Sequence, residues 1–332
     1  MELIVKPTER CNFKCSFCSS TALVDDRATT LELERIYAFL RRFPQTSTII
    51  LNGGDPLMMP PEYYWKILAY IEREGLPTTL SFTSNLWLFY LKPDVWTPLF
   101  RHERVGVTTS FHYGDTRRIS HAEVFTEEKF WAVSDLFLER VGYRPDFISV
   151  ITPENHAGAI ENVRLARRMD VECKLNYAVA SGLQSRSFLK GHVYRVYLDV
   201  IAEGLAEWEY NSKQLLALRG RLGTTCPLSR DCDSNIRCLQ PEGDYYSCGA
   251  FGDDKSHAVD FDAEVLRGGP VQTPLEADER LAFLKPECLG CPLFAICNGC
   301  KKTISDLKAE GRVEEHCGLM QGLLPELRPY VS

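Results

Sequence analysis

The sequence predicts an α/β fold with a parallel sheet in residues 1–180, followed by a cysteine-rich C-terminal region. Two observations support this prediction. Short segments rich in β-branched and aromatic residues alternate with segments of helical length, which is the pattern of βαβ units. Nine of the thirteen cysteines lie between residues 220 and 332, among many glycines and prolines. The alternation alone leaves two architectures open, a partial barrel and a doubly wound open sheet.

Six strands are expected, and most are followed by a helix. The expected strands cover Leu3–Pro7, Ser47–Asn52, Thr78–Thr83, Val105–Phe111, Phe147–Ile151 and Val171–Leu175. The expected helices cover Thr30–Arg42, Pro61–Glu74, Lys92–Phe100, Glu127–Arg140 and Gly158–Arg168. Residues 190–217 are expected to form one further long helix, or two. In either architecture the active site gathers at the carboxyl ends of the strands.

The composition is that of a soluble globular protein, since 45% of the 332 residues are hydrophobic and 25% are charged. A net charge of −7 gives no general attraction to phosphate backbones, so nucleic acid is not an expected partner. We find neither an apolar run of about 18 residues nor a signal peptide, so we expect a cytoplasmic protein without a membrane span. In a reducing cytoplasm, clustered cysteines bind metals or do redox work.

Three cysteines follow the first expected strand with the spacing C-x3-C-x2-C: Cys11, Cys15 and Cys18. Thiolates are soft ligands that suit zinc or iron–sulfur clusters. Structural zinc sites take four protein ligands, commonly from paired C-x2-C units. Three cysteines on one tight loop therefore better suit a [4Fe–4S] cluster in which one iron stays open to a small molecule.

This loop resembles the signature of the radical S-adenosylmethionine superfamily, C-x3-C-x-φ-C, with Phe17 as the aromatic φ beside the cofactor. After the second strand, Gly53-Gly54-Asp55-Pro56 resembles the superfamily's G-G-E-P segment, with Asp in place of the commoner Glu. The resemblance implies a partial (β/α)6 TIM-like barrel. It also implies that Gly53, Gly54 and Asp55 bind the amino group of S-adenosylmethionine. The implied chemistry is reductive cleavage to a 5′-deoxyadenosyl radical that abstracts hydrogen from a C–H bond.

Polar residues at the ends of the third and fourth strands complete the expected cofactor site. Ser84 and Asn85 follow the third strand, and Ser110 ends the fourth. Members of the superfamily often place polar residues at these positions, near the ribose or carboxylate of S-adenosylmethionine. The resemblance therefore implies the same role for these three residues.

The later cysteines resemble the SPASM extension, which carries two auxiliary [4Fe–4S] clusters beside the catalytic one, making three. The spacing reads Cys226-x5-Cys232-x15-Cys248, then Cys288-x2-Cys291-x5-Cys297-x2-Cys300-x16-Cys317. The ligands that the resemblance implies are Cys226, Cys232, Cys248 and Cys300 for the first auxiliary cluster, and Cys288, Cys291, Cys297 and Cys317 for the second. The alternative is two zinc sites with the same eight thiolates.

We expect a barrel domain with its connecting helices over residues 1–218, and a SPASM-type domain over 219–332. Two cysteines remain outside the implied ligand sets, Cys173 on the sixth expected strand and Cys238 between auxiliary ligands. One interpretation is that both are buried spare thiols. The other is that one of them donates a hydrogen atom to a substrate radical, as a thiol does in related epimerases.

The SPASM resemblance favours an enzyme that epimerises, cross-links or oxidises a peptide in natural-product maturation. Formylglycine formation is not favoured, because Gly249 and Ala250 follow Cys248 where sulfatase-maturing members carry an Asp. The alternatives are a sugar or nucleoside dehydrogenase, epimerase or decarboxylase in antibiotic biosynthesis, a non-catalytic electron-transfer protein, and a zinc-binding adaptor. Expected partners are the substrate and an external reductant such as flavodoxin or ferredoxin. Unless the barrel itself recognises a peptide, a separate peptide-recognition protein is expected too.

Overall fold

The computed structural model describes residues 1–18, 29–178, 180, 184, 186–218, 236–246, 249–256, 258–259, 290–297 and 301–331. The chain divides into two compact units. The first consists of Met1–Ser110, Asp115–Pro145 and Asp231–Pro274, and the second of Phe111–Gly114, Asp146–Arg230 and Leu275–Ser332. The domain boundary expected after residue 218 adjoins 219–235, which lie outside the described residues, and it stays a prediction.

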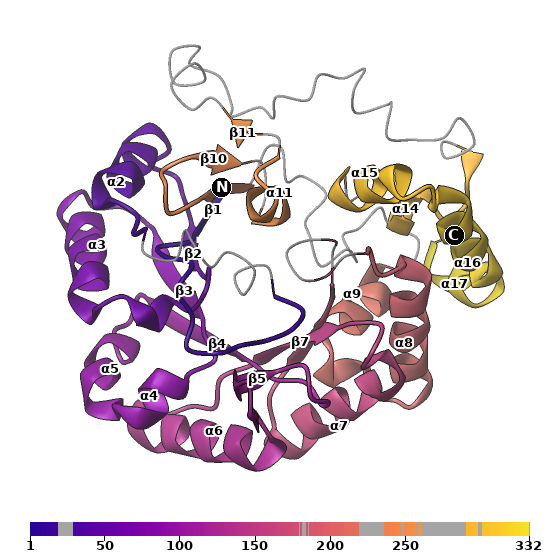
Figure 1. Ribbon diagram of the computed structural model, residues 1–332, viewed down its shortest axis with the longest axis horizontal. Coiled ribbons are helices and arrows are strands. Elements are labelled where there is room, and N and C mark those ends of the chain that lie inside the picture. The colour runs from indigo at the N-terminus through magenta and orange to yellow at the C-terminus, as the bar shows by residue number, and fades with distance from the viewer. Residues whose placement is uncertain are drawn as a thin grey trace. The chain divides into compact units, whose positions relative to one another are not determined.

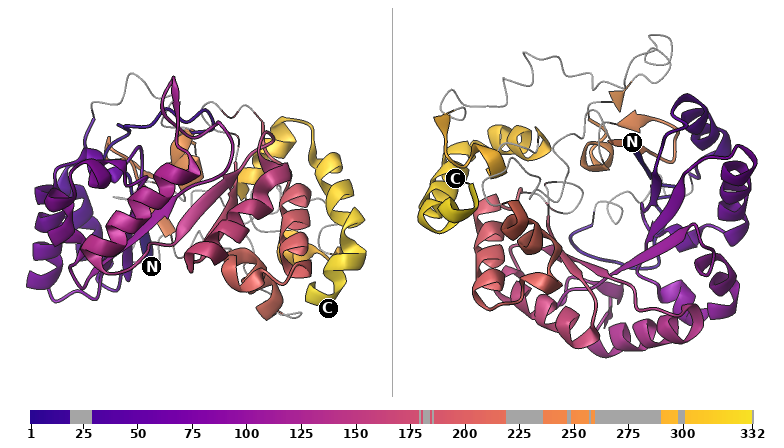
Figure 2. Two further views of the ribbon diagram at one scale, coloured as in Figure 1. Left: turned by 90° about the horizontal axis from the view of Figure 1, so that it is seen from below. Right: turned by 180° about the vertical axis from the view of Figure 1, so that it is seen from behind.

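The first unit is built on four parallel strands that alternate with helices (Figure 1). The strands, paired in this order, are β1 (Glu2–Val5), β2 (Thr48–Leu51), β3 (Thr79–Thr83) and β4 (Val105–Ser110). The helices are α2 (Leu33–Arg42), α3 (Pro61–Arg73), α4 (Trp87–Leu91), α5 (Pro93–Phe100) and α6 (Glu127–Val141). Seen from the front and from behind, α2, α3 and α5 lie along one face of these strands (Figure 1, Figure 2).

The pairing register aligns the carboxyl ends of these strands. Val5 pairs with Leu51, and Leu51 pairs with Phe82. Because parallel strands in register end at the same edge, the loops that follow β1, β2 and β3 leave the sheet side by side. That edge is where the cysteine loop and the glycine segment were expected to meet.

The C-terminal region adds three further strands to this unit. β9 (Ile236–Leu239) pairs parallel with β1, and β10 (Tyr245–Tyr246) and β11 (Ala258–Val259) continue the sheet in antiparallel fashion. The sequence prediction missed β9, because a four-residue run carries no local signal of a partner more than 200 residues away. In this register Cys238 lies opposite Ile4.

The second unit contains the parallel pair β7 (Phe147–Ile151) and β8 (Cys173–Tyr177), connected by α7 (Ala159–Met169). Helices α8 (Lys190–Ala202) and α9 (Tyr210–Leu218) follow. The stretch 190–217 therefore forms two helices, and the chain turns between them at Gly204, which has a φ of 70°. The later helices are α14 (Phe294–Cys297), α15 (Lys301–Ala309), α16 (Val313–Gly322) and α17 (Leu324–Val331).

The predicted fold class is confirmed, because six parallel strands alternate with helices and each lies within one or two residues of its expected position. The largest shift is in β8, which begins at Cys173 rather than Val171. Asp170 adopts a left-handed conformation with a φ of 56°, and the Val171 N–H donates to the Ala166 carbonyl at 3.1 Å. Val171 thus closes helix α7 instead of starting the strand.

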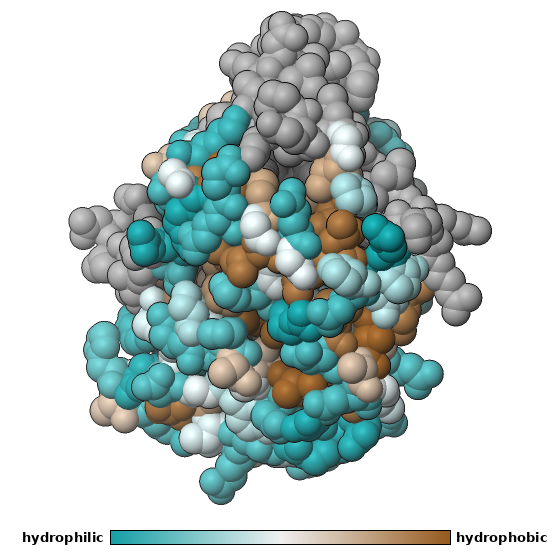
Figure 3. Space-filling view, turned by 90° about the vertical axis from the view of Figure 1, so that its right-hand side faces the viewer, coloured by the Kyte–Doolittle hydropathy of each residue, from teal (hydrophilic) through white to brown (hydrophobic). Residues whose placement is uncertain are grey.

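No helix in the described ranges is both long enough and apolar enough to cross a membrane. The face of the molecule in Figure 3 is mainly hydrophilic, with hydrophobic side chains in smaller groups between the polar ones. Inside the first unit, aromatic rings fill the space between β3 and its helices. Phe100 of α5 is 1% exposed, and its ring centroid lies 5.4 Å from that of Phe82 and 5.7 Å from that of Phe137.

We expect Phe100→Ala to lower the free energy of unfolding by about 3–5 kcal/mol, because it removes a buried ring and leaves a cavity. Leu91→Ala is the matched control, since Leu91 is 58% exposed, and its effect should stay within about 0.5 kcal/mol. Urea unfolding of both variants measures the difference. A loss in Phe100→Ala as small as that of the control would show that this aromatic cluster is not the core of the unit.

Candidate functional site

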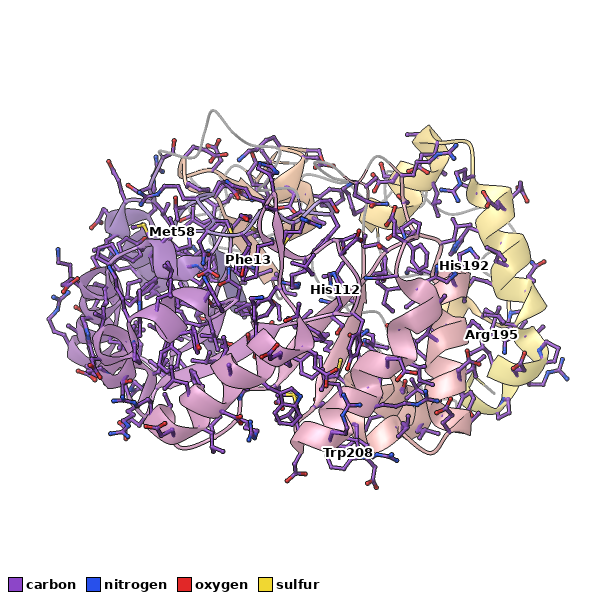
Figure 4. All side chains as sticks on the ribbon, turned by 60° about the horizontal axis from the view of Figure 1, so that its bottom comes forward. Phe13, Met58, His112, His192, Arg195 and Trp208 are labelled. Atoms are coloured by element: carbon purple, nitrogen blue, oxygen red, sulfur yellow. The ribbon has the colours of Figure 1, made fainter. Side chains whose placement is uncertain are left out.

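The loop after β1 carries Cys11, Cys15 and Cys18, and none of the three forms a disulfide in the described structure. Cys15 is buried, whereas Cys11 and Cys18 are half-buried. Phe13, between the first two cysteines, is 2% exposed and packs edge-on against Phe125, with ring centroids 5.1 Å apart (Phe13 in Figure 4). The apolar anchor in the middle of the loop therefore fixes the position of the flanking thiols.

A short hairpin holds the other side of this loop. The hairpin comprises β5 (Arg118–Ser120) and β6 (Glu123–Val124). The Lys14 N–H donates to the Arg118 carbonyl at 2.8 Å, and the Ser16 N–H donates to the Thr116 carbonyl at 3.0 Å. The sequence prediction contained no hairpin here, because its strands are only three and two residues long.

The two glycines after β2 allow the backbone to approach the start of the cysteine loop. A Cβ on Gly54 would lie 2.1 Å from the Arg10 carbonyl oxygen, and one on Gly53 would lie 2.6 Å from the Thr8 carbonyl oxygen. Gly53 also has a φ of 111°, which side chains disfavour. The Gly54 N–H donates to the Thr8 carbonyl at 3.0 Å, and the Asp55 N–H to the Arg10 carbonyl at 2.9 Å. The segment therefore docks directly onto the cysteine loop.

The Asp55 side chain joins the loops that follow β2 and β3. It is 2% exposed. One carboxylate oxygen accepts from the Leu57 N–H at 2.9 Å and the other from the Asn85 N–H at 2.9 Å, while the Ser84 hydroxyl lies 3.0 Å from both. Burial raises the pKa of Asp55 to about 6, and these hydrogen bonds oppose that rise. The predicted ligands Asp55, Ser84 and Asn85 are thus brought together by contacts among themselves.

Asn85 extends this network to the cysteine loop. Its amide donates to the Asn12 side-chain oxygen at 2.9 Å and lies 3.9 Å from the Cys11 sulfur. The next residue, Leu86, is fully buried in a left-handed conformation with a φ of 56°. Such strain in a non-glycine residue persists where surrounding contacts over-determine the backbone. The turn after β3 is therefore held rigidly, and Asn12 joins the site as a residue that spacing did not reveal.

Ser110, at the end of β4, meets a second residue that the sequence did not reveal. The Arg117 guanidinium donates to the Ser110 hydroxyl at 2.8 Å and lies 5.5 Å from the centroid of the Phe17 ring. Arg117 is 6% exposed, and its Nε is buried without a hydrogen-bond acceptor among the described residues. A buried cation beside the cysteine loop suits an anionic ligand group.

The two remaining thiols are both buried. Cys173 is the first residue of β8, at the amino end of that strand, 3.6 Å from the Ser149 hydroxyl, and burial raises the pKa of its thiol. Cys238 lies in β9, 3.6 Å from the side-chain nitrogen of Gln240. A role as hydrogen-atom donor stays a prediction for both. The position of Cys173 gives it no support, because ligands bind at the opposite, carboxyl ends of strands.

A family model of the radical SAM superfamily matches residues 5–186, which is more than half of the chain. The chain belongs to the radical S-adenosylmethionine superfamily. The match begins in β1 and includes the cysteine loop, the glycine segment and the ends of β3 and β4. The chain is therefore a radical SAM enzyme, and its family implies a [4Fe–4S] cluster and S-adenosylmethionine.

Solved structures support the same fold. Native anSMEcpe with bound AdoMet has a TM-score of 0.68 and 15% identity, and the match covers 98% of this chain and 97% of that chain. Streptococcus suis SuiB bound to its precursor peptide SuiA has a TM-score of 0.63 and 16% identity, over 91% of this chain and 72% of that chain. No curated protein sequence matches the chain. At these identities the likeness establishes the fold alone.

The cysteine loop fits a cubane cluster by the chemistry of its donors. Burial and the nearby Asp55 charge raise the pKa of the Cys11 thiol, so metal coordination is needed to keep it as a thiolate. Among the described residues, no three His, Cys, Asp or Glu side chains converge as ligands of a single metal ion. In a cubane each cysteine binds a different iron, so three thiols on one loop suit such a cluster.

Only part of the expected auxiliary site lies in the described ranges. Cys226, Cys232, Cys248, Cys288 and Cys300 lie outside them, and their assignment stays a prediction. Cys291, Cys297 and Cys317 of the second unit are half-buried and form no disulfide in the described structure. The Cys297 sulfur lies 3.2 Å from Nε2 of His316, a residue that cysteine spacing did not reveal. Burial and the nearby Lys190 charge lower the pKa of His316 to about 4, which keeps its imidazole neutral.

We expect Gly54→Ala to disrupt the cysteine loop, because the added methyl group overlaps the Arg10 backbone, which cannot move aside as a flexible side chain would. Reconstitution with iron and sulfide should then bind about four fewer irons per chain. Gly106→Ala is the control, since nothing lies within 4 Å of its Cβ position. Equal iron contents in the two variants would show that close packing at Gly54 is not required for the cluster.

Proposed function

We propose that this radical SAM enzyme modifies a peptide by abstracting hydrogen from one of its C–H bonds, with epimerisation, cross-linking or oxidation as the outcome in natural-product maturation. One observation carries the proposal: two solved structures that match nearly the whole of this chain contain bound peptides. anSMEcpe with bound AdoMet and Kp18Cys peptide matches 98% of this chain with a TM-score of 0.68. SuiB was solved with its precursor peptide SuiA.

Different residues of the first unit would hold the cluster and S-adenosylmethionine. Cys11, Cys15 and Cys18 would ligate three irons of a [4Fe–4S] cluster and leave the fourth open. When bound, that cluster and S-adenosylmethionine supply a 5′-deoxyadenosyl radical for hydrogen abstraction. The Asp55 network holds the cysteine loop against the ends of β2 and β3, and the proposed contact of its carboxylate with the amino group adds a charge pair.

Arg117 is the proposed partner of the carboxylate group of S-adenosylmethionine, just as Asp55 is the proposed partner of its amino group. Its guanidinium is buried, is fixed by Ser110, and has a nitrogen without an acceptor in the described part of the chain. A guanidinium binds a carboxylate with strong, geometrically defined hydrogen bonds. We therefore place the carboxylate of S-adenosylmethionine beside Arg117, on the side of the loop that carries Phe17.

The C-terminal cysteines would hold two auxiliary [4Fe–4S] clusters, with Cys291, Cys297 and Cys317 among the ligands of the second. Fully ligated clusters carry electrons or stabilise the fold, because no iron is open to substrate. The proposed partners are a peptide, an electron donor such as flavodoxin or ferredoxin, and a separate peptide-recognition protein where the barrel does not bind the peptide itself.

The test of radical chemistry measures 5′-deoxyadenosine release from S-adenosylmethionine by the anaerobically reconstituted protein with dithionite. Wild-type protein should bind about twelve irons per chain and cleave S-adenosylmethionine. Cys15→Ala should abolish cleavage, because the cluster loses one of its three protein ligands. Ser16→Ala is the matched control on the same loop, since its side chain is exposed and its backbone contact is retained. Two bound zincs, or iron without cleavage, would contradict the proposal.

The substrate class is tested with synthetic peptides encoded next to the gene, followed by mass spectrometry in water and in deuterium oxide. Peptide-dependent 5′-deoxyadenosine release with hydrogen loss or solvent deuterium uptake supports peptide modification. Turnover of a sugar or nucleoside, with none of any peptide, would replace the proposed substrate and leave the radical mechanism in place.

We expect Arg117→Gln to weaken S-adenosylmethionine binding by roughly tenfold or more, because a hydrogen bond to a charged group contributes about 1.5–3 kcal/mol. The iron content should not change. Arg118→Gln is the control on the same hairpin, since the Arg118 side chain donates only to the Asp115 and His121 carbonyls in the described structure. Isothermal titration calorimetry measures the affinity of both variants for S-adenosylmethionine. Equal affinities would contradict the proposed contact between Arg117 and the carboxylate.

A further inference from the structure

His316 of α16 lies at a sulfur that the proposed function makes a cluster ligand. Its side chain is 1% exposed, and Nε2 is 3.2 Å from the Cys297 sulfur. Nδ1 is also buried and has no hydrogen-bond partner among the residues that the structure describes. The contact to sulfur is thus the only hydrogen bond that this imidazole makes within the described structure.

The direction of this contact depends on the state of the sulfur, because a thiol donates or accepts whereas a thiolate only accepts. Beside a thiolate, Nε2 must therefore carry the proton and Nδ1 the lone pair. A neutral thiol is a weak acceptor and would give a buried imidazole little compensation for leaving water. A metal-bound thiolate carries negative charge and is a much stronger acceptor. With Cys297 as a cluster ligand, the contact is therefore a hydrogen bond from the Nε2–H of His316 to a thiolate sulfur.

Helix α8 holds the backbone of Cys297 and its neighbour Ile296 in place from one side. The Lys190 ammonium donates to the Cys297 carbonyl at 3.4 Å, and the Tyr194 hydroxyl donates to the Ile296 carbonyl at 2.8 Å. Both side chains are at least 97% buried.

A glycine lets α16 come close enough to α8 for this arrangement. A Cβ on Gly191 would lie 2.7 Å from Cβ of Leu319, so only glycine fits the contact between the two helices. His316 lies three residues, or nearly one turn, before Leu319 on the same helix, which places both residues on one face. The close helix contact and the His316–Cys297 contact are thus parts of one packed arrangement.

We propose that His316 donates a hydrogen bond from Nε2 to the Cys297 sulfur of an auxiliary [4Fe–4S] cluster and thereby raises the reduction potential of that cluster. The inference rests on the proposed function, since it needs Cys297 to be a ligand. The reduced cluster carries one more negative charge, part of it on its sulfurs, so a hydrogen-bond donor stabilises the reduced form more than the oxidised form. His316 is a positioning and tuning residue in this role.

The experiment is an EPR-monitored redox titration of the reconstituted full-length chain carrying Cys11→Ala, Cys15→Ala and Cys18→Ala, so that only auxiliary clusters contribute signals. In this background, His316→Phe keeps the ring volume and removes the donor, whereas His316→Gln places an amide N–H near the position of Nε2. We expect His316→Phe to make the potential of one auxiliary cluster more negative and His316→Gln to restore it. His156→Phe, an exposed histidine of the same unit, should change neither potential.

Iron analysis separates the outcomes. About eight irons per chain in the background protein and in His316→Phe, with a shifted potential, support the proposal. An unchanged potential overturns it, and so does a loss of about four irons in His316→Phe alone, because His316 would then be a ligand or purely structural. If the background protein itself binds no auxiliary clusters, the proposed cluster content is wrong, and the role of His316 is wrong with it. The iron content of the background protein distinguishes this outcome from an unchanged potential.

Discussion

The candidate site depends on one buried carboxylate. Asp55 accepts hydrogen bonds from Leu57, Ser84 and Asn85, so it ties the loop after β2 to the loop after β3. Asn85 then reaches Asn12 in the cysteine loop, which makes three loops into one network at the carboxyl edge of the sheet. Buried polar networks are stable only when their members are satisfied. The cysteine loop and the loops after β2 and β3 are separate motifs in the sequence, but in the structure they form one hydrogen-bonded network.

The same network accounts for the kind of ligand that the site favours. Burial raises the pKa of both Asp55 and Cys11, which means that negative charge in this region lacks compensation from water. A cationic group beside Asp55 would supply that compensation. Arg117 has the opposite preference and favours an anion near Ser110 and Phe17. A zwitterionic amino-acid head, such as that of S-adenosylmethionine, meets both requirements at once.

The sequence revealed those parts of the molecule whose signals are local. The spacing from Cys11 to Cys18, the glycines at 53 and 54, and the alternation of strands and helices are all short-range patterns. Arg117 and His316 could not be found in this way, because one lies beside a small hairpin and the other on a C-terminal helix. Arg117 belongs to the site because it contacts Ser110, and His316 because it contacts Cys297. Neither contact is visible as a spacing pattern in the sequence. β9 was missed for the same reason, since its partner β1 is at the other end of the chain.

The likeness to anSMEcpe and SuiB at 15% and 16% identity shows which constraints govern this fold. Few residues need to be kept for the backbone to follow the same path, because parallel βα repeats are satisfied by many hydrophobic cores. We propose that radical generation depends on a small set of groups at the sheet edge, namely the thiols, the two glycines and the Asp55 network. Substrate choice depends on other side chains, and these are free to differ between proteins with the same fold. The family therefore establishes that the enzyme uses radical chemistry, while its substrate must be identified by measuring turnover.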